Sequence, residues 1–253
     1  MQSLQLIRLL VDRELTLRYK RSVLGIGWTL VNPMFTSLIL WWVFSSIFAS
    51  RLPDGTQFAP YLIAGVLVNT FVSQGITSAA EAVAGNGSIL TKVFVRPQIF
   101  TISSAMASLV NFAIGMIPFV AVVYVSGQTL AWTFPLVFVV GFFLALFIAG
   151  VGLMCSILFI RFDDSRNIVA LILMILTYLS PIFYPISMLS ETMQNVVNAN
   201  PFTSYLNCIR WAASDNSSAT LTNWIVVVAT GLIMPIIGTF VFKKFWPRTV
   251  ALF

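Results

Sequence analysis

The feature that most constrains the fold of this chain is a set of long stretches without Asp, Glu, Lys or Arg. They cover residues 22–50, 55–80, 97–160, 167–190 and 216–242. A helix needs about 20 apolar residues to cross the hydrocarbon core of a bilayer, and each stretch is long enough. Only 9% of the residues are charged and 58% are hydrophobic, whereas a soluble domain carries about 25% charged residues. The sequence therefore predicts an all-α integral membrane protein with a single transmembrane domain over residues 1–253.

The longest of these stretches has room for two transmembrane helices. Ser126, Gly127 and Gln128 interrupt its apolar sequence near the middle with residues that favour a turn. The predicted number of transmembrane helices is therefore six. We expect them near residues 28–50, 58–80, 100–125, 134–160, 167–188 and 223–243.

The distribution of Lys and Arg predicts that the N- and C-termini are cytoplasmic, because segments rich in positive charge stay on that side during insertion. With the N-terminus inside, only Arg51 and Arg210 of the 14 basic residues lie outside. This bias and the attraction of anionic lipid headgroups explain most of the net charge of +6. We therefore expect membrane lipids, and no nucleic acid, as partners of the basic residues.

Residues 1–21 are predicted to form an amphipathic helix that lies in the membrane interface, because their apolar residues share a broad helical face. Asp12 and Glu14 interrupt the apolar sequence, which argues against a cleavable signal peptide. Glu14 and Arg18 break the apolar face four residues apart. They either pair at a solvated edge of the helix or dock against a partner or the bundle.

Residues 84–97 are predicted to form a cytoplasmic connection that contains a short helix. Asn86 or Ser88 can cap this helix. Its apolar residues, among them Leu90 and Val93, either fold back onto the lipid headgroups or anchor a soluble partner. The residues leave both interpretations open.

The connection after the fourth predicted transmembrane helix concentrates four charges between Arg161 and Arg166. We interpret it as a solvated turn. Asp163 or Asp164 is expected to cap the next helix, where a carboxylate is favoured by the helix dipole.

The region after the fifth predicted helix contains Pro181 and Pro185, which must distort or end a helix. The residues that follow are too polar to span a bilayer and too apolar for a free loop. We expect short helices at the outer interface over residues 188–197 and 202–213, where they can form a gate.

Enzyme chemistry finds little support in the sequence. Histidine is absent, which removes the commonest general base and metal ligand, and there is no G-x-x-x-x-G-K-[ST] phosphate loop. Cys155 and Cys208 lie toward opposite faces of the membrane in the predicted topology, so neither a disulfide nor a metal cluster is indicated. The predicted helices also lack the carboxylates of proton-driven carriers. We expect no catalytic residue, metal or bound cofactor on this chain.

Aromatic residues gather in or near the first and fifth predicted helices. They are Trp28, Trp41, Trp42, Tyr178, Phe183 and Tyr184. Such rings anchor a helix at the membrane interface, and they also offer faces on which sugar rings stack. Both roles remain open from the residues alone.

Several motifs, in their order and spacing, resemble the membrane subunit of bacterial polysaccharide ABC exporters, which move lipid-linked O-antigen, capsule or teichoic acid chains. The resemblance covers nearly the whole chain. It rests on the run from Arg18 to Trp28 with Asn32-Pro33, on residues 90–93 with Arg96-Pro97, on residues 161–164, and on residues 181–184 followed by Asn200-Pro201.

The resemblance implies a homodimer of six-span subunits in the bacterial inner membrane, each bound to a separate subunit that holds ATP and Mg²⁺ and hydrolyses the nucleotide. The first and fifth helices of the two copies would line a channel for a polyprenyl-linked polysaccharide, with the six aromatic residues facing it. The N-terminal helix and residues 84–97 would receive the motion of the ATPase, and helices within residues 188–213 would gate the exit. The residues in contact with the ATPase would be Asn86, Ser88, Leu90, Lys92, Val93 and Phe94. The residues that meet the carrier pyrophosphate would be the cations Arg18, Lys20 and Arg21.

Two other function classes are compatible with the residues. A membrane-embedded sugar or lipid transferase would need carboxylates for acid–base catalysis, and the adjacent Asp163 and Asp164 offer such a pair. A passive channel subunit would conduct without nucleotide. A permease subunit would instead be inert without its ATPase.

Overall fold

The described residues of the computed structural model are 2–19, 25, 27–48, 57–90, 95–213 and 219–249, and within them the regular structure is entirely helical. The helices follow one another as α1 (Gln2–Tyr19), α2 (Gly27–Phe48), α3 (Phe58–Ala84), α4 (Gly87–Leu90), α5 (Gln98–Val125), α6 (Leu136–Arg161), α7 (Ser165–Leu179), the 3₁₀ turn η2 (Ile186–Met188), α8 (Glu191–Ala199), α9 (Pro201–Ala213) and α10 (Leu221–Thr249). The all-α class predicted from the sequence is thus confirmed.

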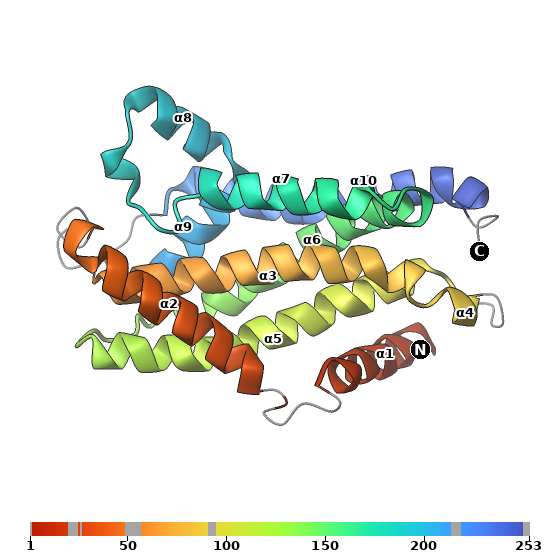
Figure 1. Ribbon diagram of the computed structural model, residues 1–253, viewed down its shortest axis with the longest axis horizontal. Helices are drawn as coiled ribbons and strands as arrows, with labels where there is room; N and C mark the ends of the chain where they lie inside the picture. Colours follow the sequence, from red (N-terminus) through yellow and green to blue (C-terminus); the bar gives the residue numbers. More distant parts are fainter. Residues whose placement is uncertain are drawn as a thin grey trace.

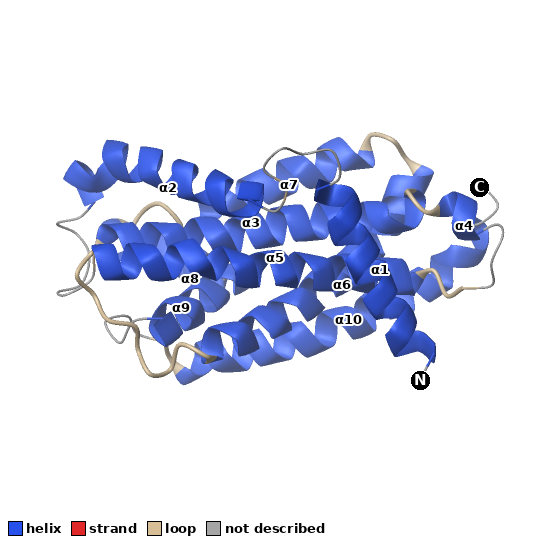
Figure 2. Ribbon diagram, turned by 90° about the horizontal axis from the view of Figure 1, so that it is seen from below, coloured by secondary structure: helices blue, strands red, loops and turns tan. Residues whose placement is uncertain are grey.

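The long helices run side by side as an elongated bundle (Figures 1 and 2). Helix α6 packs most extensively against α10, and α3 packs against both α5 and α6. Glycines allow the closest of these contacts. A Cβ on Gly238 of α10 would collide with the backbone of Gly150 on α6, so both positions need a residue without a side chain.

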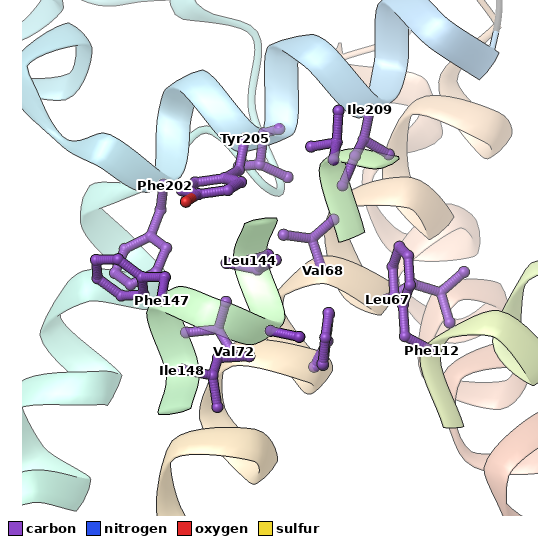
Figure 3. Close-up of a cluster of buried hydrophobic side chains, with 14 of the residues drawn as sticks. Leu67, Val68, Val72, Phe112, Leu144, Phe147, Ile148, Phe202, Tyr205 and Ile209 are labelled. Atoms are coloured by element: carbon purple, nitrogen blue, oxygen red, sulfur yellow. The ribbon is translucent and has the colours of Figure 1, made fainter. Parts of the chain in front are cut away.

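A continuous apolar core joins α3, α5 and α6 with α9. Leu144 and Ile148 of α6 are fully buried, Leu144 beside Val68 and Ile148 beside Val72 of α3 (Figure 3). The rings of Phe71 and Phe112 stack with their centres 4.9 Å apart. Because these side chains come from helices distant in the sequence, the core fixes how the helices are arranged.

Five helices are long and apolar enough to cross a membrane, namely α2, α3, α5, α6 and α10. Their bounds lie within a few residues of the predicted ones at most ends, and the prediction of a multi-pass membrane protein is confirmed. The exception is α7, predicted to extend to residue 188, which ends at Leu179. Its 15 residues span about 22 Å, less than the roughly 30 Å of a hydrocarbon core. Pro181 explains the early end, because the residue before a proline disfavours the helical conformation and Ser180 is extended.

The chain ends and α4 lie at one end of the bundle, whereas η2 and α8 lie at the other (Figures 1 and 2). Helix α1 packs against α5, and its Leu9 is 66% exposed. Helix α2 packs on α3 and α5 but leaves most of its apolar residues uncovered. Helix α4, which holds the predicted coupling residues Ser88 and Leu90, therefore lies at the opposite end of the bundle from α8, which belongs to the predicted gate.

Candidate functional site

Four of the six predicted channel aromatics lie on α2 and α7, which both pack on α3. On α2, Trp28, Trp41 and Trp42 are exposed, and Trp42 is the most exposed of the three at 76%. On α7, Tyr178 is 66% exposed. These four rings are available to a ligand, a second protein or lipid.

The other two predicted aromatics occupy the irregular segment after α7 and are only partly accessible. Phe183 packs against the apolar core and against the ring of Tyr178, whose centre is 6.5 Å away. Tyr184 donates a hydrogen bond from its hydroxyl to the carbonyl oxygen of Tyr178 at 2.9 Å. Both residues therefore stabilise the backbone turn at Pro181, and each also keeps part of its ring exposed.

The N-terminal helix docks on the bundle through the two residues after Asp12. The Glu14 carboxylate accepts a hydrogen bond from the buried Ser104 hydroxyl of α5 at 3.4 Å. The Arg13 guanidinium donates to the side-chain oxygen of Asn86 at 2.8 Å. Glu14 thus contacts the bundle, as one of the two interpretations expected. The side chain of Arg18 lies outside the described residues, so the alternative pairing of Glu14 with Arg18 stays a prediction.

Asn86 joins α1 to the turn between α3 and α4. Its side-chain amide donates to the carbonyl oxygen of Ala82 at 2.8 Å while its oxygen accepts from Arg13. Leu90, at the end of α4, is half-buried against a small apolar cluster of Val83, Leu153, Ile157 and Phe242. Leu90 therefore contributes to packing at this end of the bundle.

The remaining predicted coupling and phosphate residues are described less fully. Ser88 lies in α4 and Arg18 lies in α1 by their backbones. The positions of Lys20, Arg21, Lys92, Val93 and Phe94 lie outside the described residues. The roles assigned to these residues stay predictions.

The charged turn between α6 and α7 connects to α3. Arg166 lies 3.8 Å from the Glu81 carboxylate and 3.5 Å from that of Asp163. Asp164 occupies the N-cap position of α7, as one of the two predicted caps, but makes no side-chain cap hydrogen bond. Ser165 instead donates to the carbonyl oxygen of Phe162 at 2.6 Å. The carboxylate of Asp163 is thus used as an ion-pair partner of Arg166.

A buried arginine lies toward the opposite end of the bundle. Arg210 is on α9, and 6% of it is exposed. Its guanidinium donates to the carbonyl oxygens of Pro181 at 2.9 Å, Tyr61 at 3.1 Å and Ile182 at 3.4 Å. It also lies 3.4 Å from the centre of the Tyr61 ring. Burial lowers the pKa of the Arg210 guanidinium and Tyr61 opposes that shift, but an arginine side chain in a protein keeps its charge.

Tyr61 and Gly65 on α3 complete what we call the arginine clasp, which comprises Arg210, Tyr61, Gly65, Pro181 and Ile182. The Tyr61 hydroxyl donates to the carbonyl oxygens of Pro181 at 3.1 Å and Tyr184 at 3.0 Å. A Cβ on Gly65 would lie 3.0 Å from the guanidinium and from Ile182. The clasp therefore satisfies carbonyl groups that the break after α7 removes from helical hydrogen bonding.

Helix α9, which corresponds to the short helix predicted over residues 202–213, is packed within the bundle. Ten of its residues are buried. The Tyr205 hydroxyl donates to the carbonyl oxygen of Val227 at 3.1 Å, and Asn200 just before α9 donates to the Ser180 hydroxyl at 3.0 Å. Its polar side chains thus find partners within the bundle, which removes the cost of burying them.

Sequence reasoning placed Arg210 outside and gave no role to Tyr61. A signal for Arg210 was present, because a single arginine in a semi-apolar segment is costly to bury and therefore marks a polar partner. The sequence could not identify that partner, because Tyr61 precedes Arg210 by 149 positions.

Comparison with known proteins shows similarity to a transporter family and to export permeases. The family model for the ABC-2 type transporter matches residues 5–213. The O-antigen export system permease protein RfbA of Klebsiella pneumoniae is 25% identical over 244 residues, which cover 94% of this chain and 91% of the relative. A protein of the same name from Myxococcus xanthus is 27% identical over 199 residues, with 78% of this chain and 75% of the relative covered.

Proposed function

Because this chain belongs to the ABC-2 type transporter family, we propose that it is the membrane subunit of an ATP-driven exporter of a lipid-linked, O-antigen-like polysaccharide. The observation that carries the proposal is the match to O-antigen export permeases over 94% of the chain. The bundle of long apolar helices supports it, because such helices suit a membrane-spanning subunit. We place the protein in the bacterial inner membrane with both termini in the cytoplasm.

The proposed complex contains two copies of this chain and two copies of an ABC-type ATPase, which binds ATP and Mg²⁺. The exposed apolar faces of α2, α7 and α10 support a membrane location with lipid or protein neighbours, because apolar surface of this extent is unfavourable in water. In this proposal α7 is the sixth membrane element, and the irregular segment that follows it completes the crossing within protein.

The proposed route of the glycan lies along α2 and α7, with Trp28, Trp41, Trp42 and Tyr178 as its exposed aromatic surface. The exposure of these rings supports this assignment. The carrier pyrophosphate would meet Arg18, Lys20 and Arg21 at the cytoplasmic end, since guanidinium and ammonium groups bind phosphate well.

The proposed coupling element comprises α1 and the segment that contains α4. The Arg13–Asn86 hydrogen bond supports joint movement of these two parts. Leu90 attaches the segment to the apolar cluster at the end of α3, α6 and α10. A push by the ATPase on residues 91–94 would therefore reach the bundle through α3.

The test is reconstitution of the tagged chain with its candidate ATPase in vesicles, followed by ATP hydrolysis and export of lipid-linked glycan. The wild-type pair should assemble and export only with ATP. Val93→Asp should abolish coupling, whereas Val125→Asp, a matched change at a residue that is 89% exposed near the other end of the bundle, should not. Export without nucleotide would favour a passive channel, and glycan transfer by the chain alone would favour a transferase.

A further inference from the structure

A band of uncharged polar side chains runs along the middle of α3. Its members recur at intervals that place them along one side of the helix. We call this the α3 polar band, and it comprises Asn69, Thr70, Ser73, Gln74, Thr77 and Ser78. Because α3 extends from Phe58 to Ala84, the band occupies the depth that would correspond to the centre of a bilayer.

The α3 polar band faces hollows between α3 and its neighbours. Asn69 and Ser73 line a small cavity toward α7, where the Thr177 hydroxyl donates to the side-chain oxygen of Asn69 at 2.8 Å. Thr70 and Gln74 line a second one toward α2 and α5. Four residues of the band, Ser73, Gln74, Thr77 and Ser78, also line a shallow, open recess at the surface of α3. In Figure 1 the part of α3 beyond its crossing with α2 is uncovered between α7 and α5.

Gln74 is the member of the band that lipid would accommodate least well. A helical hydroxyl can bond to its own helix, as Thr77 does by donating to the carbonyl oxygen of Ser73 at 2.9 Å. The exposed Gln74 amide has two donors and one acceptor oxygen, and among the described residues it has no hydrogen-bond partner. An amide in hydrocarbon without partners costs several kcal/mol. Gln74 therefore indicates that this recess receives water or a polar ligand.

The chemistry of the α3 polar band suits a neutral polyhydroxylated ligand. Its hydroxyl and amide groups both donate and accept hydrogen bonds, as sugar hydroxyls do. None of its members is charged, so the band offers repeated weak contacts rather than one strong site. Repeated weak contacts favour transport, because a transported species must leave each site as readily as it enters.

We propose that the α3 polar band contacts the sugar hydroxyls of the polysaccharide as it passes between α2 and α7. This inference rests on the proposed function and adds a hydrogen-bonding surface on α3 to the aromatic surfaces of α2 and α7. Because its side chains are uncharged, the band would bind different neutral sugars similarly. It would therefore allow different repeat units to pass, and its polar groups would keep apolar lipid out of the path.

A second copy of the chain is the competing occupant, because Ser, Thr and Gln side chains also form hydrogen bonds between transmembrane helices. The position of the band argues for the glycan. Helix α3 packs against both α2 and α7, the two helices whose exposed aromatic rings are proposed to face the glycan. The two occupants predict opposite results for a cysteine at position 74.

The first experiment uses Gln74→Cys with Cys155 and Cys208 replaced by alanine, assembled with the ATPase in vesicles. A water-soluble thiol reagent should label Cys at position 74, and added lipid-linked glycan should slow the labelling. Ile117→Cys, at an exposed apolar position of α5, is the control and should remain unlabelled. An intermolecular disulfide at position 74, or labelling that glycan leaves unchanged, would overturn the inference.

The second experiment compares Gln74→Leu with Gln57→Leu, a matched change at the exposed residue before α3. Gln74→Leu should raise the glycan concentration for half-maximal export about fivefold, the effect of one lost hydrogen bond, whereas Gln57→Leu should leave that concentration unchanged. Equal export by both variants would refute the role of Gln74. If the wild-type complex exports glycan and the Gln74 results fail, only this inference falls; if the wild-type complex exports nothing, the proposed function falls.

Discussion

Replacement of Arg210 by methionine tests whether the arginine clasp holds the break after α7 in place. Two of its hydrogen bonds to carbonyl oxygens are 2.9 and 3.1 Å long, and the third is 3.4 Å. A hydrogen bond from a charged donor contributes about 1.5–3 kcal/mol, and a desolvated cation over an aromatic face contributes about 2 kcal/mol. Methionine also removes the cost of burying a cation. The Ile182 carbonyl, however, would lose its Arg210 donor, so we expect a net loss of about 2–4 kcal/mol.

The assay is thermal unfolding of the purified protein in detergent. A loss of 2–4 kcal/mol should lower the midpoint by about 5–10 °C for a chain of this size. Arg161→Met is the matched control, because Arg161 is exposed and its guanidinium lies 5.4 Å from the Phe162 ring, a contact worth about 0.5–1 kcal/mol. The unfolding midpoint of Arg210→Lys should fall between those of the wild type and Arg210→Met. An ammonium group keeps the charge but lacks the planar guanidinium that reaches several carbonyl oxygens at once.

Equal midpoints for Arg210→Met and Arg161→Met would refute the reasoning, because they would show that the hydrogen bonds of the clasp add nothing beyond the cost of burying the cation. The Tyr61→Phe variant provides an independent check. It removes the hydroxyl that contacts Pro181 and Tyr184 but keeps the ring beneath the guanidinium. We expect a loss of about 1–2 kcal/mol, whereas Tyr124→Phe, at a tyrosine that is 61% exposed, should change nothing.

Further predictions concern the glycines and the two ends of α3. Gly65→Ala should destabilise the protein, because its Cβ would lie 3.0 Å from Arg210 and Ile182, whereas Gly85→Ala meets nothing closer than 3.4 Å and should be tolerated in the same unfolding assay. Gly238→Ala should prevent folding or separate α6 from α10, seen as loss of a monodisperse peak in size-exclusion chromatography. Glu81→Gln should change stability by less than about 1 kcal/mol, because its ion pair with Arg166 is half-exposed and 3.8 Å long; a larger change would mean that this pair is desolvated in the membrane. Asn86→Ala removes the contact with Arg13, so it should reduce export by the reconstituted complex strongly and lower the unfolding midpoint of the protein only slightly. A large loss of both export and thermal stability would indicate a purely structural role.

The positions of the long helices could be predicted because lipid imposes one rule on every segment that crosses it. Hydrogen bonds of the backbone must close within the helix, so a charge-free stretch that is long enough to cross the bilayer is expected to be helical. The predicted 58–80 and 100–125 correspond to Phe58–Ala84 and Gln98–Val125. Helix α7 departs from this rule because Pro181 interrupts it before the apolar sequence ends. The length of an apolar stretch alone therefore overestimates the length of a helix that a proline ends.

The arginine clasp could not be predicted, because its contacts depend on tertiary packing. The positive-inside rule assigned Arg210 to the outer side of the membrane, but this rule does not predict whether a residue is buried. The structure buries it, because the break after α7 leaves carbonyl oxygens that need a donor, and α9 enters the bundle next to them. The contact between Glu14 and Ser104 could not be predicted for the same reason, because the two residues lie 90 positions apart in the sequence.

Helix α3 connects the separate clusters of this molecule. It carries Tyr61 and Gly65 of the arginine clasp near its start, the α3 polar band in its middle and Glu81 near its end, five residues before Asn86. Its 27 residues form a rod about 40 Å long, and most of its apolar residues are buried against α5 and α6. A well-packed helix moves as a unit rather than bending gradually. In the proposed exporter, a displacement of α4 by the ATPase would therefore shift the polar band and the arginine clasp together. The contacts with the glycan and the position of the break after α7 would then change in the same step.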